Sequence, residues 1–331
     1  MSHAYLRAGL DIGGSKILAA AVDQRGRVVE TLRRATRTGP EGVVDTATEA
    51  VEALGELVGG RRALTGVGVG FPGLVDADRG DVMHAVNLDV TSRVPLADLL
   101  RERLGVRVAV ENDVNAAALG TATALGLGRA GVGYLSIGTG LGAGLVIDGR
   151  LHRGSRAAAG EIGHIPVDPA GPLCNCGQHG CLEVLASGTA IASRWPHAEG
   201  GGPAAHLFAA AAAGDPAAVA VRDEVAGHIA EAVRLLVLTV DVDAVVLGGG
   251  VAEVGEPLVD AVRDALRRQA AVSAFLRDLD LAGRVRITPA GIPVAAIGAA
   301  LLVPAWTAGS VDGVVPGHPD DRSGELGRVA P

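Results

Sequence analysis

Short apolar runs alternate with longer amphipathic stretches along the first half of the chain. The apolar runs are rich in valine, leucine, isoleucine and alanine and stop at glycine or polar residues, as buried strands do. The longer stretches repeat apolar residues every three or four positions, which predicts helices. Strands are expected within residues 6–31, 64–76 and 106–113, and helices at 41–59, 95–105 and 115–128. This alternation predicts an α/β fold class.

The second half has longer helical stretches. After a loop region at 150–183, the periodicity predicts helices at 187–195, 203–214, 215–240, 256–270 and 294–306, with strands at 243–250 and 284–290. Residues 307–331 are rich in glycine, proline and charge, so a flexible tail is predicted there.

One sequence pattern occurs twice. "LDIGGSKILAAAVDQRGR" at 10–27 and "LSIGTGLGAGLVIDGR" at 135–150 share an apolar strand, a glycine turn, an apolar return strand and an Asp followed by Gly-Arg. We interpret both as glycine-turn hairpins, one in each half, although two glycine-rich hairpins can also be alike by chance.

Length and composition narrow the class of protein. A chain of 331 residues fits about two domains, and 48% hydrophobic with 20% charged residues is a globular composition. The net charge of −8 and an aromatic content of 2% argue against nucleic-acid binding. The first residues lack the pattern of a signal peptide, and no apolar run reaches 18 residues. A cytoplasmic protein with no membrane partner is expected.

Glycine turns can surround phosphate oxygens with backbone amides. The first turn, Gly13 to Lys16, has Asp11 before it, and the second, Gly138 to Gly140, has Ser136 in that place. Asp11 could bind Mg²⁺, Ser15 and Thr139 offer hydroxyls, and Lys16 offers a positive charge. Lys16 is also the only lysine among the 29 lysine and arginine residues. The pair of turns predicts a nucleotide held between two domains.

Asn112 and Asp113 lie where a predicted strand meets a helix. Ligands of open α/β folds collect at the carboxyl ends of strands, where Asp113 could accept a proton. Asp113 could instead be the N-cap of the next helix, and judged alone this second reading is favoured.

All three cysteines, Cys174, Cys176 and Cys181, fall within eight residues. An odd, clustered set indicates a metal site, and three thiolates need a fourth ligand for Zn²⁺. His164 is favoured over His179 for that position. No ligand position is left open, so the zinc is expected to be structural and to hold the loop that carries Glu161 and Glu183.

The order of these motifs resembles the ROK family of bacterial sugar kinases and repressors over about residues 8 to 303. The matching segments are Asp-x-Gly-Gly-Ser-Lys at 11–16, Glu-Asn-Asp-x-Asn-Ala-Ala at 111–117, Gly-Thr-Gly-x-Gly-x-Gly at 138–144, Gly-Glu-x-Gly-His at 160–164, Cys-x-Cys-Gly-x-x-Gly-Cys-x-Glu at 174–183 and Leu-Gly-Gly-Gly at 247–250.

The resemblance implies an actin-like, hexokinase-type ATPase fold with two α/β domains around a cleft and a structural zinc loop. A small domain is then expected from residues 1–114 plus the helix at 294–306, and a large one from 115–293. The resemblance makes Asp113 the general base. It gives sugar contacts to Asn112, Glu161, His164, Glu183 and Gly73. ATP would be held by Asp11, Gly13, Gly14, Ser15, Lys16, Gly138, Thr139, Gly140, Gly249 and Gly250, and zinc by His164, Cys174, Cys176 and Cys181.

The implied activity is ATP- and Mg²⁺-dependent transfer of the γ-phosphate to the 6-hydroxyl of a hexose, with glucose favoured and N-acetylglucosamine or N-acetylmannosamine as alternatives. Val90 stands near a place where members often have tryptophan, which leaves the sugar open. A sugar-sensing regulator is a remoter alternative, because ROK repressors have a DNA-binding segment before the first hairpin, which here begins near residue 8. Family members are commonly dimers or tetramers, so a homo-oligomer is expected.

Overall fold

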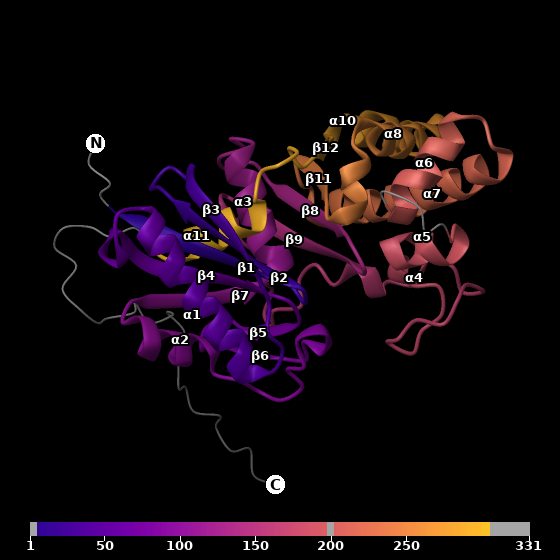
Figure 1. Cartoon of the computed structure of the whole chain (residues 1–331). Helices are drawn as coiled ribbons and strands as arrows, with labels where there is room; N and C mark the ends of the chain where they lie inside the picture. Colours follow the sequence, from indigo (N-terminus) through magenta and orange to yellow (C-terminus); the bar gives the residue numbers. More distant parts are fainter. Residues whose placement is uncertain (1–4, 197–201, 305–331) are drawn as a thin grey trace, which may run out of the picture.

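The computed structural model describes residues 5–196 and 202–304. It contains two five-stranded sheets whose strands follow the same plan (Figure 1). The first sheet has the order β3-β2-β1-β4-β7 and the second the order β10-β9-β8-β11-β12. In each, three strands are joined antiparallel and the last two are added in parallel. The predicted repeat of the hairpin therefore extends to the whole sheet.

The strands of the first sheet are β1 (Leu6–Ile12), β2 (Lys16–Val22), β3 (Val28–Ala35), β4 (Leu64–Phe71) and β7 (Arg107–Asn112). Those of the second are β8 (Val132–Ile137), β9 (Leu141–Ile147), β10 (Arg150–Leu151), β11 (Ala244–Gly248) and β12 (Val285–Ile287). A small hairpin is formed by β5 (Leu74–Asp76) and β6 (Asp81–Met83). The apolar runs expected to be strands are therefore strands, and Arg150 and Leu151 add a short one inside the expected loop.

The longer helices are α1 (Pro40–Leu57), α2 (Leu96–Leu104), α3 (Asp113–Ala124), α5 (Gly188–Arg194), α6 (Gly202–Ala212), α7 (Pro216–Val240), α8 (Glu256–Ala271) and α11 (Val294–Leu302). Short helices not expected from the sequence are α4 (Leu182–Ala186), α9 (Ala274–Asp278) and α10 (Leu281–Arg284). Helix α7 starts where a cap predicts it, because Asp215 accepts hydrogen bonds from Ala217 N and Ala218 N at 2.8 and 3.1 Å. No helix in the described ranges is long and apolar enough to cross a membrane.

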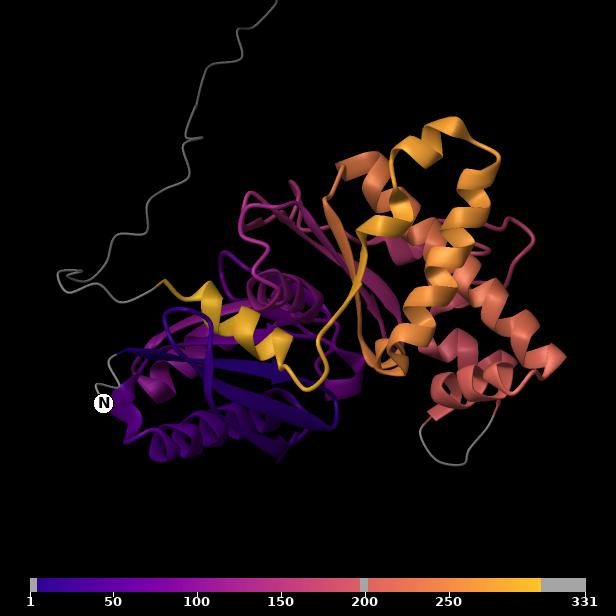
Figure 2. The same ribbon diagram turned by 90° about the horizontal axis from the view of Figure 1, so that it is seen from above.

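The last helix returns to the first sheet. Figure 2 shows α11 beside β1 and β2, although it is the last described helix of the chain. Gly9 of β1 and Gly68 of β4 lie so close to it that a Cβ on either would overlap a carbonyl oxygen of α11. Arg7 fixes the end of α11, because its Nη1 donates to Val303 O at 3.0 Å across 296 residues of sequence. The first sheet is thus covered by α1 on one face and α11 on the other.

The predicted helix 294–306 is too long. It ends at Leu302, Val303 is extended, and Pro304 follows, which disfavours helical backbone at the residue before it. The predicted tail, 307–331, lies outside the described residues. The predicted domain boundary after residue 114 falls in α3, which packs against α11 and also against β8 and β9, so the division stays a prediction.

Candidate active site

A cleft of about 920 Å³ opens between the two sheets. Its walls come from both glycine turns, the β7–α3 junction, the β5–β6 hairpin and the segment 153–161. Ten of the predicted site residues line it, namely Gly13, Gly14, Gly73, Asn112, Asp113, Gly138, Thr139, Gly140, Glu161 and Glu183. Asp11, Ser15, Lys16, His164, Gly249 and Gly250 are not among its lining residues. The structure therefore brings together most of the set, from segments far apart in the sequence.

The structure of the β7–α3 junction shows which residue caps helix α3, a point that the sequence leaves open. Asn112 is the N-cap of α3, since its Oδ1 accepts from Val114 N at 2.9 Å and from Asn115 N at 3.2 Å. Asp113 is the first residue of the helix itself, and its Oδ1 contacts Val114 N at 2.9 Å. The capping role that the local pattern alone favours for Asp113 is wrong, because the residue before it provides the cap.

The environment of Asp113 is suited to a base. Burial raises the pKa of Asp113 to about 6, the negative charge of Asp11 adds to this, and the hydrogen bond from Val114 N opposes it. Burial also raises the pKa of Asp11, while the positive charge of Lys16 lowers it. The negative charges of Asp11 and Asp113 therefore repel each other, and the positive charge of Lys16 acts on Asp11.

The first glycine turn is held from outside by Thr36. Its Oγ1 donates to Gly13 O at 2.8 Å, and its backbone N donates to Ser15 O at 3.1 Å. Inside the turn, Gly13 N donates to Lys16 O at 3.0 Å. Because these bonds fix the carbonyl groups, they also fix the peptide planes whose N–H groups would bind phosphate oxygens.

The second glycine turn is held in a comparable way by the start of α5. Gly188 N donates to Gly138 O at 2.7 Å, and Thr189 Oγ1 donates to Thr139 O at 2.8 Å. Beside this turn, Leu141 N donates to Glu183 Oε2 at 3.1 Å. The sequence showed the two turns but not the segments that hold them.

Gly249 lies next to the second turn. It has a φ of 79°, and a Cβ there would lie 2.6 Å from Ile137 O, so the close approach requires glycine. The buried phenol of Tyr134 connects it with the carboxylates: burial raises the pKa of Tyr134 to about 12, a hydrogen bond from Gly249 N opposes this, and the charges of Asp11 and Asp113 add to it. Gly249 therefore packs against Ile137, the residue before the second turn, and does not itself line the cleft.

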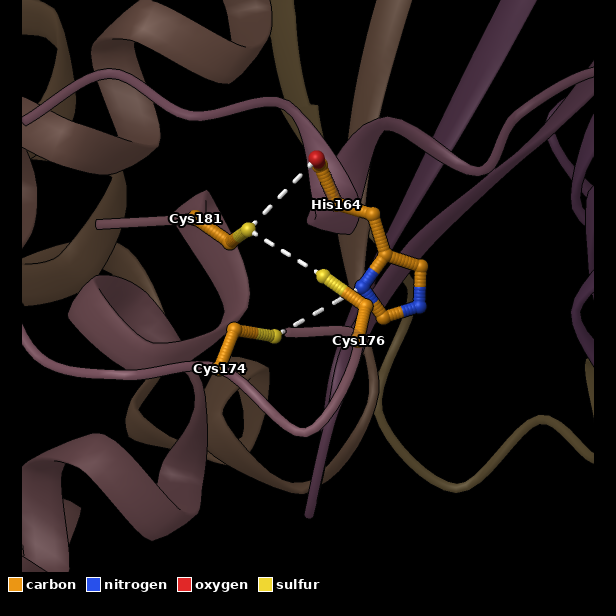
Figure 3. A group of neighbouring side chains, drawn as sticks. All are labelled: His164, Cys174, Cys176 and Cys181. Carbon is orange, nitrogen blue, oxygen red and sulfur yellow. Dashed lines mark hydrogen bonds between the residues drawn. The ribbon is translucent and has the colours of Figure 1, made fainter. Parts of the chain in front are cut away.

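His164 and the three cysteines form a compact group (Figure 3). One ligand atom from each residue lies within 4.8 Å of all the others. His164 Nδ1 is 3.7 Å from Cys174 Sγ, and Cys176 Sγ is 3.6 Å from Cys181 Sγ. Tetrahedral zinc with Zn–S bonds of ~2.3 Å places its ligand atoms ~3.5–3.8 Å apart. The donor set and its spacing fit zinc.

His179, the competing ligand, is engaged elsewhere. Its Nδ1 lies 3.0 Å from Gly171 O, and it is outside the group formed by His164 and the cysteines. Figure 3 shows the second ring nitrogen of His164 pointing away from the sulfur atoms. One ring nitrogen of His164 is thus available for another contact.

The loop that carries the three cysteines connects to the cleft through α4. Cys181 is the N-cap residue of α4, and Glu183 lies in its first turn. A Cβ on Gly140 would overlap Glu183 Oε2, so the carboxylate packs directly on the second glycine turn. Any group that fixes Cys181 therefore fixes Glu183 and the strand that starts at Leu141.

The repeated sheets and the cleft between them define an actin-like, hexokinase-type ATPase fold, as the sequence predicts. The ROK family model matches residues 7–305, and the chain belongs to the ROK family. A glucokinase from Streptomyces coelicolor is 37% identical over 282 residues, covering 80% of this chain and 87% of that protein. An N-acetylmannosamine kinase from Yersinia pseudotuberculosis is 33% identical over 242 residues, covering 73% and 82%.

A solved structure is similar over nearly the whole chain. It is a ROK family glucokinase from Streptomyces griseus in complex with glucose and AMPPNP, with a TM-score of 0.73 and 36% identity, covering 90% of this chain and 98% of that one.

Proposed function

We propose that the chain is an ATP- and Mg²⁺-dependent glucokinase that transfers the γ-phosphate to the 6-hydroxyl of glucose. The observation that carries the proposal is the place of Asp113, a buried carboxylate with a raised pKa in a cleft lined by both glycine turns. Similarity to glucokinases at 35–37% identity supports glucose over N-acetylmannosamine, for which the similarity is 33%.

In the proposed reaction, Asp113 takes the proton of the 6-hydroxyl as its oxygen attacks the γ-phosphorus. The amides of the turns at 13–16 and 138–140, with Gly249 and Gly250, hold the phosphates and the nucleotide. Mg²⁺ near Asp11 would neutralise charge on the phosphate oxygens. Asn112, whose Oδ1 caps α3 and whose Nδ2 donates to Gly73 O at 3.2 Å, keeps one amide hydrogen for a sugar hydroxyl.

Glu161, Glu183 and the free ring nitrogen of His164 complete the proposed sugar contacts, with Gly73 beside them. Gly73 has a φ of 101°, and a Cβ there would lie 2.8 Å from Met83 O, so a side chain could not be added without moving this wall of the cleft. In this proposal zinc, held by His164, Cys174, Cys176 and Cys181, is structural.

A sugar panel tests the proposal. We expect ADP release with glucose in the presence of Mg²⁺, at a kcat/KM about tenfold or more above that for N-acetylglucosamine or N-acetylmannosamine. A preference for either N-acetylhexosamine would replace glucose as the substrate. Sugar binding without turnover on any hexose would instead favour a sugar-sensing regulator.

The pH dependence follows from the raised pKa. Asp113 acts as a base only when deprotonated, so kcat/KM should fall about tenfold per pH unit below the pKa of about 6 and stay level above it. The measurement is kcat/KM as a function of pH over about 4.5 to 8, with each value corrected for loss of enzyme stability. A profile with no acid limb near 6 would contradict this role.

Lys16 provides a test of the first turn. Replacing Lys16 with arginine keeps the charge but substitutes a planar group for a compact ammonium, so we expect KM for ATP to rise about tenfold. Arg34→Lys on the neighbouring strand β3, where Arg34 pairs with Glu49, is the matched control and should leave KM unchanged. Unchanged ATP kinetics in the Lys16→Arg variant would show that the turn does not depend on lysine.

A further inference from the structure

Glu111 is a buried carboxylate of the cleft to which the proposed reaction gives no role. The residue is only 2% exposed, yet it lines the cleft at the end of β7. Its Oε1 accepts from Asn112 N and from Asn115 Nδ2, each at 3.0 Å. Its Oε2 accepts from Arg153 Nε at 2.5 Å. A carboxylate this deep is tolerated because its oxygens are bonded and its charge is paired.

The ion pair joins the two sheets. Glu111 belongs to the first sheet, while Arg153 follows β10 of the second. Both side chains line the same cleft, with side-chain exposures of 3% for Glu111 and 38% for Arg153. The buried carboxylate of Glu111 in the first sheet is therefore paired with Arg153, which comes from the half of the chain that forms the second sheet.

On each side of the pair lies a segment of the proposed active site. Asn112 and Asp113 follow Glu111 directly, and the Glu111 carboxylate binds the backbone of Asn112. On the other side, the loop after Arg153 folds back on it, since Ala159 N donates to Arg153 O at 3.1 Å, and Ala143 N then donates to Gly160 O at 2.8 Å. The loop continues to Glu161, one of the proposed sugar contacts.

We propose that Glu111 and Arg153 are positioning residues that hold the loop 154–161 in register with the Asn112–Asp113 segment, so that sugar contacts from both halves meet around one hexose. This inference rests on the proposed function and adds to it a pair that touches neither the sugar nor ATP. A displacement of about 1 Å between reacting groups can cost about 100-fold in rate. Loss of the pair should raise KM for the sugar and lower kcat, and should leave ATP binding unchanged.

The test compares Arg153→Met, Arg153→Lys and Glu111→Gln with the wild type. Arg153→Met keeps the aliphatic length but removes the charge and the donors, so we expect kcat/KM for glucose to fall about 100-fold while KM for ATP stays within about twofold of the wild-type value. Arg153→Lys restores a charge and should recover most of the loss. The double variant Glu111→Gln with Arg153→Met should be no worse than the more impaired single variant, because one pair is lost only once.

Arg129→Gln is the matched control. Arg129 pairs with Asp148 at 2.9 Å in the same half, but both side chains are largely exposed, so its loss should not change the kinetics. Wild-type glucose kinetics in Arg153→Met would overturn the inference, and so would a rise in KM for ATP as large as the loss in kcat/KM for glucose. A wild-type enzyme inactive on every hexose would overturn the proposed function instead. Because Glu111 is buried, a Glu111→Gln variant that fails to fold leaves the Arg153 variants to decide.

Discussion

Replacing Asp113 with asparagine is expected to lower kcat for glucose by about 10²- to 10⁴-fold, the usual contribution of a positioned general base. Asparagine has the same shape and keeps an oxygen for the bond from Val114 N, but it cannot take the proton of the 6-hydroxyl. The α3 helix should be unaffected because Asn112 caps it. Steady-state kinetics and glucose binding by calorimetry, on the same preparation, would show turnover lost and binding retained.

Asp215→Asn is the control for this substitution. Asp215 is a true N-cap, of α7, and asparagine caps helices as well as aspartate does. Its kinetics should equal those of the wild type. If the Asp113→Asn variant were as active as the Asp215→Asn variant, Asp113 would not be the base, whatever its pKa.

Replacing Cys181 with serine is expected to lower the zinc content from about one per chain to near zero, because a four-ligand structural site has no spare thiolate. The change should also reduce glucose affinity, since Cys181 starts the short helix that carries Glu183 against the second glycine turn. Metal analysis of protein purified without chelators, a thermal unfolding curve and KM for glucose are the three measurements.

His179→Gln distinguishes this ligand set from its competitor. His179 lies 3.0 Å from Gly171 O through Nδ1 and is outside the cysteine group, so this variant should keep its zinc. Loss of zinc from the His179→Gln variant, with retention in a His164→Gln variant, would reverse the assignment of the fourth ligand.

Local sequence patterns predict much of the fold because hydrophobic periodicity and turn residues reflect interactions between neighbours in the chain. The two hairpins at 10–27 and 135–150 each show their strands and turn in sequence, and both are the first pair of a five-stranded sheet. The cysteine spacing likewise indicated the zinc-type cluster that the structure assembles. These features depend on residues close together in the chain.

Contacts between distant residues could not be read from the sequence. Glu111 belongs to a motif that the sequence shows, but nothing marks Arg153, 42 residues away, as its partner. Thr36 likewise gives no sign that it holds the Gly13 turn. The choice between Asn112 and Asp113 as helix cap depends on backbone angles at one residue, which composition does not determine.

The position of α11 has a consequence for biosynthesis. Arg7 and Val303, which meet at the end of that helix, are 296 residues apart, so at about 5–20 residues per second the ribosome takes roughly 15–60 s to make the second after the first. During that time the glycine-lined face of the first sheet has no α11 to cover it. The amino-terminal half therefore cannot finish folding in the order of translation, because its sheet is completed only when the last described helix has been made.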